Sequence, residues 1–269
     1  ILLSNMSGGN SIEEKFFNIG NGVEIHPGQL TVGGMMLILD NYGAVRLEPV
    51  TGMELTDWGQ GQLPPTLDVT NPPIITNIYK TGYAFTALDV TGKVHVWGRG
   101  GYGGSLPDTL DPNNVTNPPK ITNIYSVNGA FAALDVNRKV HVWGHGDYGG
   151  SLPDTLDPAN DPPKITNIYS TQGAFAALDV NRKVHVWGYA NYGDQLPEIL
   201  TNSTITKMFS ANYTFTALTS DHRVVMWGNS NFDKIGKNSS GEKVNVIYNV
   251  RTMSINGNTV TATHMDGTT

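Results

Sequence analysis

Residues 120–144 read KITNIYSVNGAFAALDVNRKVHVWG, and residues 164–188 repeat this stretch almost unchanged as KITNIYSTQGAFAALDVNRKVHVWG. Weaker copies occupy residues 74–98 (IITNIYKTGYAFTALDVTGKVHVWG) and 205–228 (ITKMFSANYTFTALTSDHRVVMWG). A Trp-Gly pair closes each copy and occurs once more upstream, at Trp58, Trp97, Trp143, Trp187 and Trp227. These pairs lie 39 to 46 residues apart. Such a period indicates a domain built from repeated supersecondary units.

Degenerate copies extend the repeat toward both ends of the chain. KFFNIGN at 15–21 matches RVVMWGN at 223–229, and VTATHMDG at 260–267 matches FTALTSDH at 215–222. We therefore predict one domain over residues 1–269. Its units fall near 1–29 (partial), 30–77, 78–123, 124–167, 168–207, 208–252 and 253–269 (partial). Because the first residue is Ile1 and not Met, we expect a piece of a longer protein.

Each unit contains strand signals and no sustained helical period. AFAALDV and KVHVWG are short, rich in Val, aromatic and small residues, and separated by turn residues such as Thr91-Gly92 and Asn137-Arg138. KITNIYS supplies a further strand. Two-residue hairpin turns need positive φ, for which Arg138, Arg182 and His222 are poor residues, so the turn type stays open.

A unit of about forty residues cannot bury both faces of its own small sheet. Radial packing buries each sheet against its neighbours. We therefore predict an all-β β-propeller with four short antiparallel strands per blade and little or no helix. A stacked solenoid is the competing architecture.

The repeat resembles that of the regulator of chromosome condensation family, in which an Ala-Leu hairpin and a Trp-Gly end precede an Asn-x-x-Gly-Gln-Leu loop. Gly193-Asp194-Gln195-Leu196 and Gly61-Gln62-Leu63 match that loop. The resemblance covers roughly residues 15–267 and is strongest to bacterial members. It implies seven blades. Hairpins at 37–45, 85–94, 131–140, 175–184, 215–224 and 260–267 give six, and ILLSN at 1–5 fits the remnant of a seventh.

Composition argues against several classes of function. The 269 residues are 15% charged with a net charge of −6, which disfavours nucleic acid as a partner. The chain has no Cys and no apolar stretch long enough to span a bilayer. Its sequence contains no serine-hydrolase elbow, phosphate-binding loop or zinc-peptidase motif. We therefore expect no enzyme activity, no cofactor and no metal.

Two polar residue types recur in the hairpins: His95, His141 and His185, and Asp89, Asp135 and Asp179. Equivalent positions in different blades are spread around a ring, so the histidines cannot meet at one metal ion. We interpret them as copies left by duplication, and the aspartates as caps of the turns. The PDTLDP loops at 107–112 and 153–158 are too sparse in acids for calcium, and we interpret them as solvated.

Aromatic residues recur where a propeller places its loops. One set follows the last four Trp residues by five positions, and a second set replaces Gly129 and Gly173 of the best-matched copies. Tyrosine anchors interfaces well, although packing of the first set between neighbouring loops is an open alternative. The predicted binding residues are Tyr83, Arg99, Tyr102, His145, Tyr148, Tyr189, Tyr192, Tyr213 and Phe232.

We expect a non-enzymatic recognition module of a secreted or surface bacterial protein, such as an adhesin, toxin or effector, that binds a protein or glycan ligand. Flanking domains of the parent chain are further candidate partners. The alternative, from fold analogy, is a regulator of another enzyme. It would be a nucleotide exchange factor for a small GTPase or an inhibitor of β-lactamases. The extra segment at 46–57 would then be an inserted hairpin.

Overall fold

The structure is a computed structural model that describes residues 31–32, 35–39, 45–49, 73–229, 231, 236–237, 243–256 and 259–268. Over these ranges the regular elements are strands and short 3₁₀ helices, with a single four-residue α-helix, α1 (Glu198–Thr201). The predicted all-β class is therefore confirmed.

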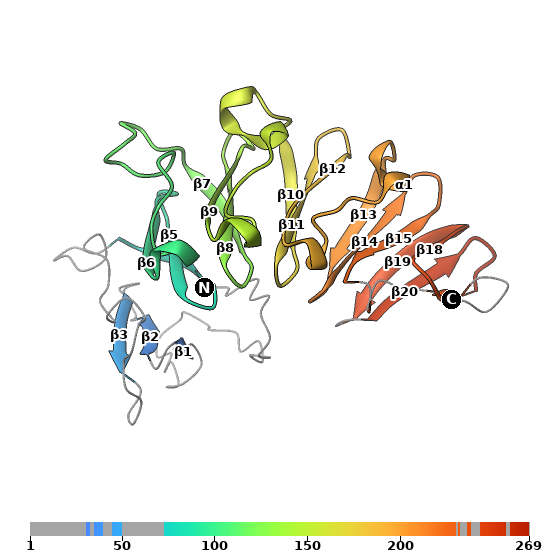
Figure 1. Ribbon diagram of the computed structural model, residues 1–269, viewed down its shortest axis with the longest axis horizontal. Helices are drawn as coiled ribbons and strands as arrows, with labels where there is room; N and C mark the ends of the chain where they lie inside the picture. The colour runs from blue at the N-terminus through green and yellow to red at the C-terminus, as the bar shows by residue number, and fades with distance from the viewer. Residues whose placement is uncertain are drawn as a thin grey trace.

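Four copies of the repeat each form an antiparallel sheet, which we call blades A to D. Blade A consists of β4 (Ile75–Lys80), β5 (Ala84–Asp89) and β6 (Val94–Gly98); blade B of β7 (Ile121–Ser126), β8 (Ala130–Asp135) and β9 (Val140–Gly144); blade C of β10 (Ile165–Ser170), β11 (Ala174–Asp179) and β12 (Val184–Gly188); and blade D of β13 (Ile205–Ser210), β14 (Thr214–Thr219), β15 (Val224–Gly228) and β18 (Val246–Ile247). The sheets follow one another in an arc (Figure 1).

Partial copies flank these blades. β1 (Thr31–Val32), β2 (Met35–Leu39) and β3 (Val45–Pro49) form one sheet, and β19 (Val250–Asn256) and β20 (Thr259–His264) form another. Leu39 pairs with Val45 as Leu88 pairs with Val94 in blade A, so the hairpin predicted at 37–45 is present. β16 (Gly236–Lys237) pairs with β17 (Lys243–Val244). The described ranges do not fix the number of blades, and seven stays a prediction.

Blades A to C have three strands each in place of the expected four, and only blade D has a fourth among the described residues. After each Trp-Gly pair the chain enters a 3₁₀ turn that ends in a glycine of left-handed conformation, such as Gly149 (φ 93°). A proline-bearing loop follows. Proline has no amide hydrogen for a sheet ladder, so this segment does not extend the blade.

The hairpin loops have three residues and not the two that we expected. In blade B the amide of Arg138 donates to the carbonyl of Asp135, and the amide of Asp135 donates to the carbonyl of Lys139, both at 3.0 Å. A type I turn followed by one left-handed residue gives this geometry. Positive φ is therefore needed only at the last loop position, where Arg138 (65°), Arg182 (63°) and His222 (64°) stand.

Hydrophobic cores form between neighbouring blades. Phe131 and Trp143 of blade B cluster with Tyr79 and Leu88 of blade A, and the corresponding pairs of blades C and D pack against blades B and C. Phe131 is fully buried, as are Phe175 and Phe215 at the same position. Each blade therefore completes the core of the next, which is the packing expected of a propeller.

Backbone hydrogen bonds join neighbouring blades at both ends. At one end the amides of Gly82, Asn128 and Gln172 donate to the carbonyls of Asn128, Gln172 and Asn212, each at 2.8 Å. At the other end the amides of Ile121, Ile165, Ile205 and Val250 donate to the last loop residue of the preceding hairpin, at 2.9 to 3.0 Å. The loops at both ends are therefore held in fixed register from blade to blade.

Candidate binding surface

The repeated aspartates cap the hairpin turns, as predicted. Asp89 Oδ1 accepts hydrogen bonds from the amides of Thr91 (2.8 Å) and Lys93 (3.0 Å). Asp135 and Asp179 accept the equivalent pairs of amides. These carboxylates are buried and committed to the backbone, which is a structural role.

Each repeated histidine pairs with the aspartate of its own hairpin, a contact that the sequence analysis missed. His95 Nε2 lies 3.0 Å from Asp89 Oδ2, and His141 and His185 lie 3.2 Å from Asp135 and Asp179. Burial lowers the pKa of His95 and of His141, although the partner aspartate opposes this shift. Burial would raise the pKa of Asp89, but hydrogen bonds from Thr91, His95 and Lys93 outweigh it and lower that pKa.

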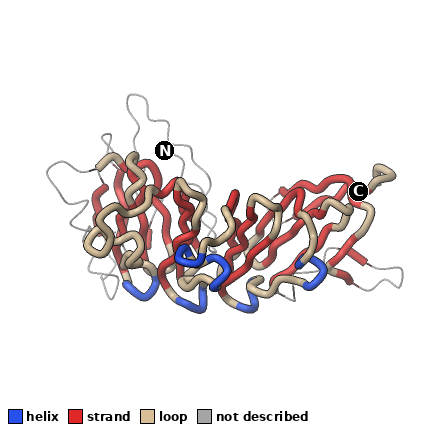
Figure 2. Tube along the Cα trace, turned by 90° about the horizontal axis from the view of Figure 1, so that it is seen from above, coloured by secondary structure: helices blue, strands red, loops and turns tan. Residues whose placement is uncertain are grey.

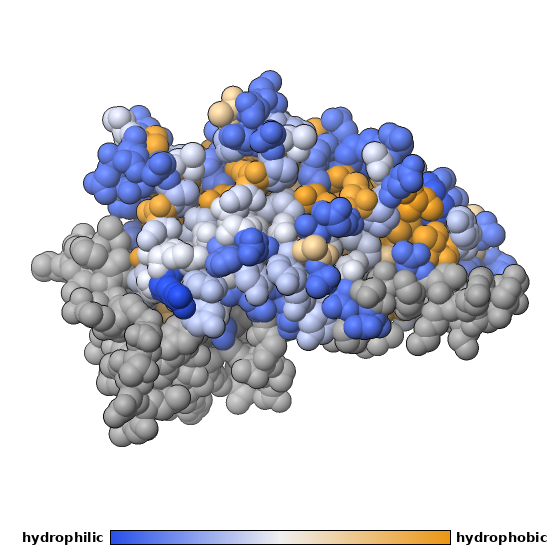
Figure 3. All heavy atoms as spheres, viewed as in Figure 1, coloured by the Kyte–Doolittle hydropathy of each residue, from blue (hydrophilic) through white to orange (hydrophobic). Residues whose placement is uncertain are grey.

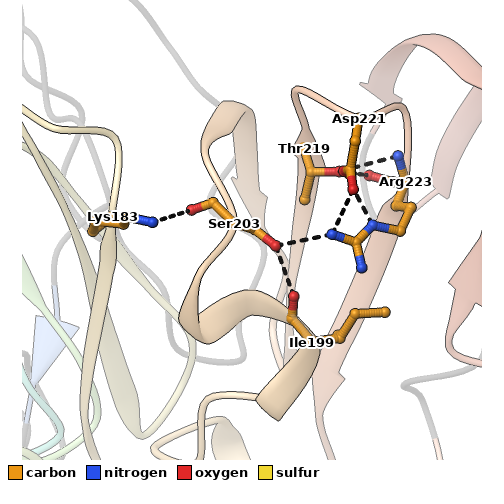
Figure 4. Close-up of polar contacts among 6 residues, drawn as sticks. All are labelled: Lys183, Ile199, Ser203, Thr219, Asp221 and Arg223. Atoms are coloured by element: carbon orange, nitrogen blue, oxygen red, sulfur yellow. Dashed lines mark hydrogen bonds and ion pairs between the residues drawn. The ribbon is translucent and has the colours of Figure 1, made fainter.

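Blade D replaces this pair with another polar cluster at the same turn (Figure 4). Arg223 Nη2 lies 2.7 Å from Asp221 Oδ2 and donates to Ser203 Oγ at 3.1 Å. Ser203 Oγ donates to the carbonyl of Ile199, and its own carbonyl accepts from Lys183 of blade C at 3.2 Å. The cluster therefore links two blades, and its groups satisfy one another.

The acidic loops at 107–112 and 153–158 also serve local structure. Asp111 and Asp157 accept hydrogen bonds from the amides two residues on, and Leu110 and Leu156 are buried anchors. In the part of the chain that the structure describes, no three His, Asp or Glu residues gather as a metal site.

Most of the predicted aromatic residues lie in one local structure that recurs in blades A, B and C. After the Trp-Gly pair, one extended residue precedes a 3₁₀ helix whose last residue is a tyrosine: η2 (Gly100–Tyr102), η3 (Gly146–Tyr148) and η6 (Ala190–Tyr192). The preceding residues are Arg99, His145 and Tyr189. Short helices lie along one edge of the arc (Figure 2). Each blade therefore presents two neighbouring side chains at the same place.

Packing beneath these turns makes them rigid. A Cβ added at Gly149 would lie 2.8 Å from the ring of Phe175, so the turn of blade B sits directly on the core of blade C. Phe175 stacks on Trp187 with ring centroids 5.3 Å apart, and Trp187 Nε1 donates to the carbonyl of Gly149 at 3.1 Å. The neighbouring blade thus fixes the backbone that carries Tyr148.

The aromatic side chains of successive blades touch one another without interruption. We call this set the aromatic strip: Tyr83, Tyr102, His145, Tyr148, Tyr189, Tyr192 and Tyr213. Consecutive ring centroids along it are 4.5, 5.2, 5.6, 5.6, 5.6 and 5.8 Å apart. Burial, and then the hydroxyls of neighbouring tyrosines, raise the pKa of Tyr148, as expected for closely spaced phenols.

The strip combines contact between blades with exposure to solvent. Tyr83 and Tyr189 are 37% and 38% exposed, and the other tyrosines of the strip are partly buried. At one end the Arg99 guanidinium lies 4.9 Å from the ring centroid of Tyr102 and 5.7 Å from that of Tyr83. Residues of intermediate hydropathy, pale in Figure 3, cover much of the middle of the face shown there.

The structure brings the predicted binding residues that it describes into one surface, with Arg99 at an end of the strip. Phe232 lies outside the described residues. Two of the tyrosine rings lie over glycines, which the residue pattern alone did not predict. A Cβ at Gly129 would lie 2.9 Å from Tyr148, and one at Gly173 would lie 2.9 Å from Tyr192. The alternation of Gly and Tyr at this repeat position was the signal that could have revealed them.

No family model matches the chain, and no curated protein matches it by sequence. Human WBSCR16 is 14% identical over 72% of this chain and 59% of its own, with a TM-score of 0.45. The CRINKLY WD40 ectodomain of the Arabidopsis thaliana receptor kinase ACR4 is 15% identical over 73% of this chain and 63% of its own, with a TM-score of 0.43. The chain thus spans less than two thirds of both solved structures.

Prp20p of Saccharomyces cerevisiae, the yeast RCC1, is 17% identical over 88% of this chain and 69% of its own, with a TM-score of 0.45. The solved structures similar to this chain therefore include a member of the family that its repeat resembles. At this identity and TM-score the likeness carries no information on function, which has to be inferred from the surface itself.

Proposed function

We propose that the chain is a non-enzymatic recognition module that binds a protein or glycan ligand through the aromatic strip and Arg99. One observation carries this proposal. Side chains from four successive blades, separated by up to 130 residues in sequence, form one continuous, partly exposed aromatic surface.

Rigid aromatic side chains bind well because they bury a large area and lose few rotamers on binding. Here the backbone below the strip is already fixed by the cores and hydrogen bonds between blades. A partner would therefore meet a preformed surface, which lowers the cost of association.

The repeated polar side chains of the described residues hold the turns and loops in place, and this favours a binding role over a catalytic one. The hairpin aspartates and histidines are engaged with the turns, and the acidic loops cap their own backbone. No helix among the described residues is long and apolar enough to cross a membrane. A secreted or surface bacterial setting belongs to the proposal and rests on the sequence resemblance. The regulator alternative has no supporting observation, because residues 50–57 of the segment at 46–57 lie outside the described residues.

A capture experiment tests the proposed function. The chain is immobilised and exposed to an extract that contains both proteins and polysaccharides, and the retained protein and sugar are quantified. The same measurement is made with the double variant Tyr148→Ala/Tyr192→Ala. We expect retention of a ligand of one class that the double variant loses.

The matched control is the double variant Val136→Ala/Val180→Ala. Val136 and Val180 are exposed in the same two blades, at the hairpin turns on the opposite end. This variant should retain the ligand. If the valine and tyrosine variants retain equal amounts, the strip is not a binding surface and the proposal fails.

A further inference from the structure

We infer that the ligand of the aromatic strip is a linear, uncharged glycan that lies along several blades. This inference rests on the proposed function and narrows its ligand class. Three features of the strip carry it: the spacing of the rings, the scarcity of charge and of exposed aliphatic groups around them among the described residues, and the recurrence of one tyrosine from blade to blade.

The ring spacing disfavours a proline-rich peptide, the other repetitive ligand that aromatic surfaces recognise. Such peptides dock in grooves between aromatic side chains. A ring sandwiched between two others needs van der Waals contact of about 3.5–4.0 Å on each face, so the outer rings must stand about 7–8 Å apart. Consecutive rings here are at most 5.8 Å apart and already touch. Consecutive rings of the strip therefore leave no slot between them for a pyrrolidine ring.

The tilts between rings suit a ligand that lies on top of the strip. Four of the contacts have interplanar angles between 40° and 75°, at Tyr83–Tyr102, Tyr102–His145, His145–Tyr148 and Tyr189–Tyr192. Successive rings thus turn their faces in different directions, and the strip is not a single closed stack. Ring faces can receive the C–H faces of sugars, while phenol hydroxyls both donate to and accept from sugar hydroxyls.

The surroundings of the strip favour a neutral partner. Arg99 stands at one end, and the exposed Asp147 lies 3.9 Å from His145. At the corresponding place in blade C the residues are Asn191 and Tyr189, which are uncharged. The exposed aliphatic side chains Val90, Val136 and Val180 belong to the hairpin turns at the other end of the blades. Among the described residues, the surface around the strip therefore offers a partner few aliphatic groups.

The repetition of the strip fits a polymer. In blades B and C the tyrosine ring packs in the same way against a glycine, Tyr148 over Gly129 and Tyr192 over Gly173. Tyr83 and Tyr213 occupy the positions of those glycines in their own blades and are the first and last residues of the strip among the described residues. A ligand made of repeating sugar units can make the same contact in successive blades, so affinity should grow with chain length up to the length of the strip.

The test begins with the chain on an array of neutral and acidic polysaccharides, with a decaproline peptide in parallel. Isothermal titration then compares the hexasaccharide and the disaccharide of the polysaccharide bound best. We expect a neutral glycan to bind, the hexasaccharide to bind at least about tenfold more tightly than the disaccharide, and Tyr148→Ala/Tyr192→Ala to weaken it by about tenfold or more. Val136→Ala/Val180→Ala should leave the affinity within about twofold.

Two further variants keep the test decisive. Tyr189→Ala removes one well exposed ring and serves if the double tyrosine variant unfolds. Tyr148→Phe keeps the ring and removes only the hydroxyl, so it should lose less affinity than alanine. The glycan inference is overturned if no neutral glycan binds, if decaproline or an acidic glycan binds instead, or if binding ignores the tyrosine variants. If a protein is then retained in a strip-dependent way, the proposed function still stands and only the ligand class is wrong.

Discussion

At the scale of single residues, the burial of His95 and His141 makes stability depend on pH. The pKa values of His95 and His141 lie below the ordinary 6.5, so the unfolded chain binds protons more readily than the folded one. Stability is therefore full above about pH 6.5 and falls as the pH drops below it. The lowered pKa of Asp89 acts in the same direction below about 3.8. Urea unfolding at pH 7.5 and 5.0 should show a loss of stability that His95→Gln/His141→Gln reduces. An unchanged pH dependence in this variant would contradict the assignment.

The last residue of the hairpin loop gives a second prediction at this scale. Arg138 is exposed and has a φ of 65°, where a side chain costs about 1 kcal/mol and glycine costs little. Glycine stands there in blade A, as Gly92 with φ 85°. Arg138→Gly should therefore raise the free energy of unfolding by up to about 1 kcal/mol, reduced by the greater freedom of glycine in the unfolded chain. Denaturant titration checks it, and a clear loss of stability would show that the Arg138 side chain is needed.

At the scale of the elements, the turn after each Trp-Gly pair depends on the blade that follows. Gly149→Ala would place a methyl group against Phe175 at a positive φ, so we expect a loss of roughly 2 kcal/mol or more. Gly101 offers a matched control, because a Cβ there would meet nothing within 4 Å and the residue lies in the equivalent 3₁₀ helix of blade A. Thermal unfolding of both alanine variants gives the comparison. Equal unfolding midpoints for the two variants would argue against close packing of Gly149 on Phe175.

Much of the fold and of the candidate binding surface could be predicted from the repeat. Strand positions, the capping role of Asp89 and the recurrence of the strip tyrosines follow from periodicity and residue type. The contact of Asp89 with His95 could not be predicted. It depends on a three-residue hairpin loop that brings together two residues separated by six positions in sequence. The contact of Tyr102 with His145 likewise depends on how closely two blades approach. Periodicity predicts which residues are equivalent, but not which of them touch.

At the scale of the whole molecule, neighbouring blades share cores and backbone hydrogen bonds, so they should unfold together. Phe175→Ala removes a fully buried ring at the boundary of blades B and C and should cost about 3–5 kcal/mol. Hydrogen exchange in β8 and β14, on either side, should speed up along with β11. Faster exchange confined to β11 would indicate blades that are stable independently.

The proposed function places ligand binding on the aromatic strip. The most direct test is the dissociation constant of the captured ligand for the parent chain, for Tyr148→Ala/Tyr192→Ala and for Val136→Ala/Val180→Ala, each shown to be folded by its thermal transition. The predicted result is an affinity at least about tenfold weaker for the tyrosine variant and within about twofold of the parent for the valine variant. Equal affinity in all three proteins would contradict the claim.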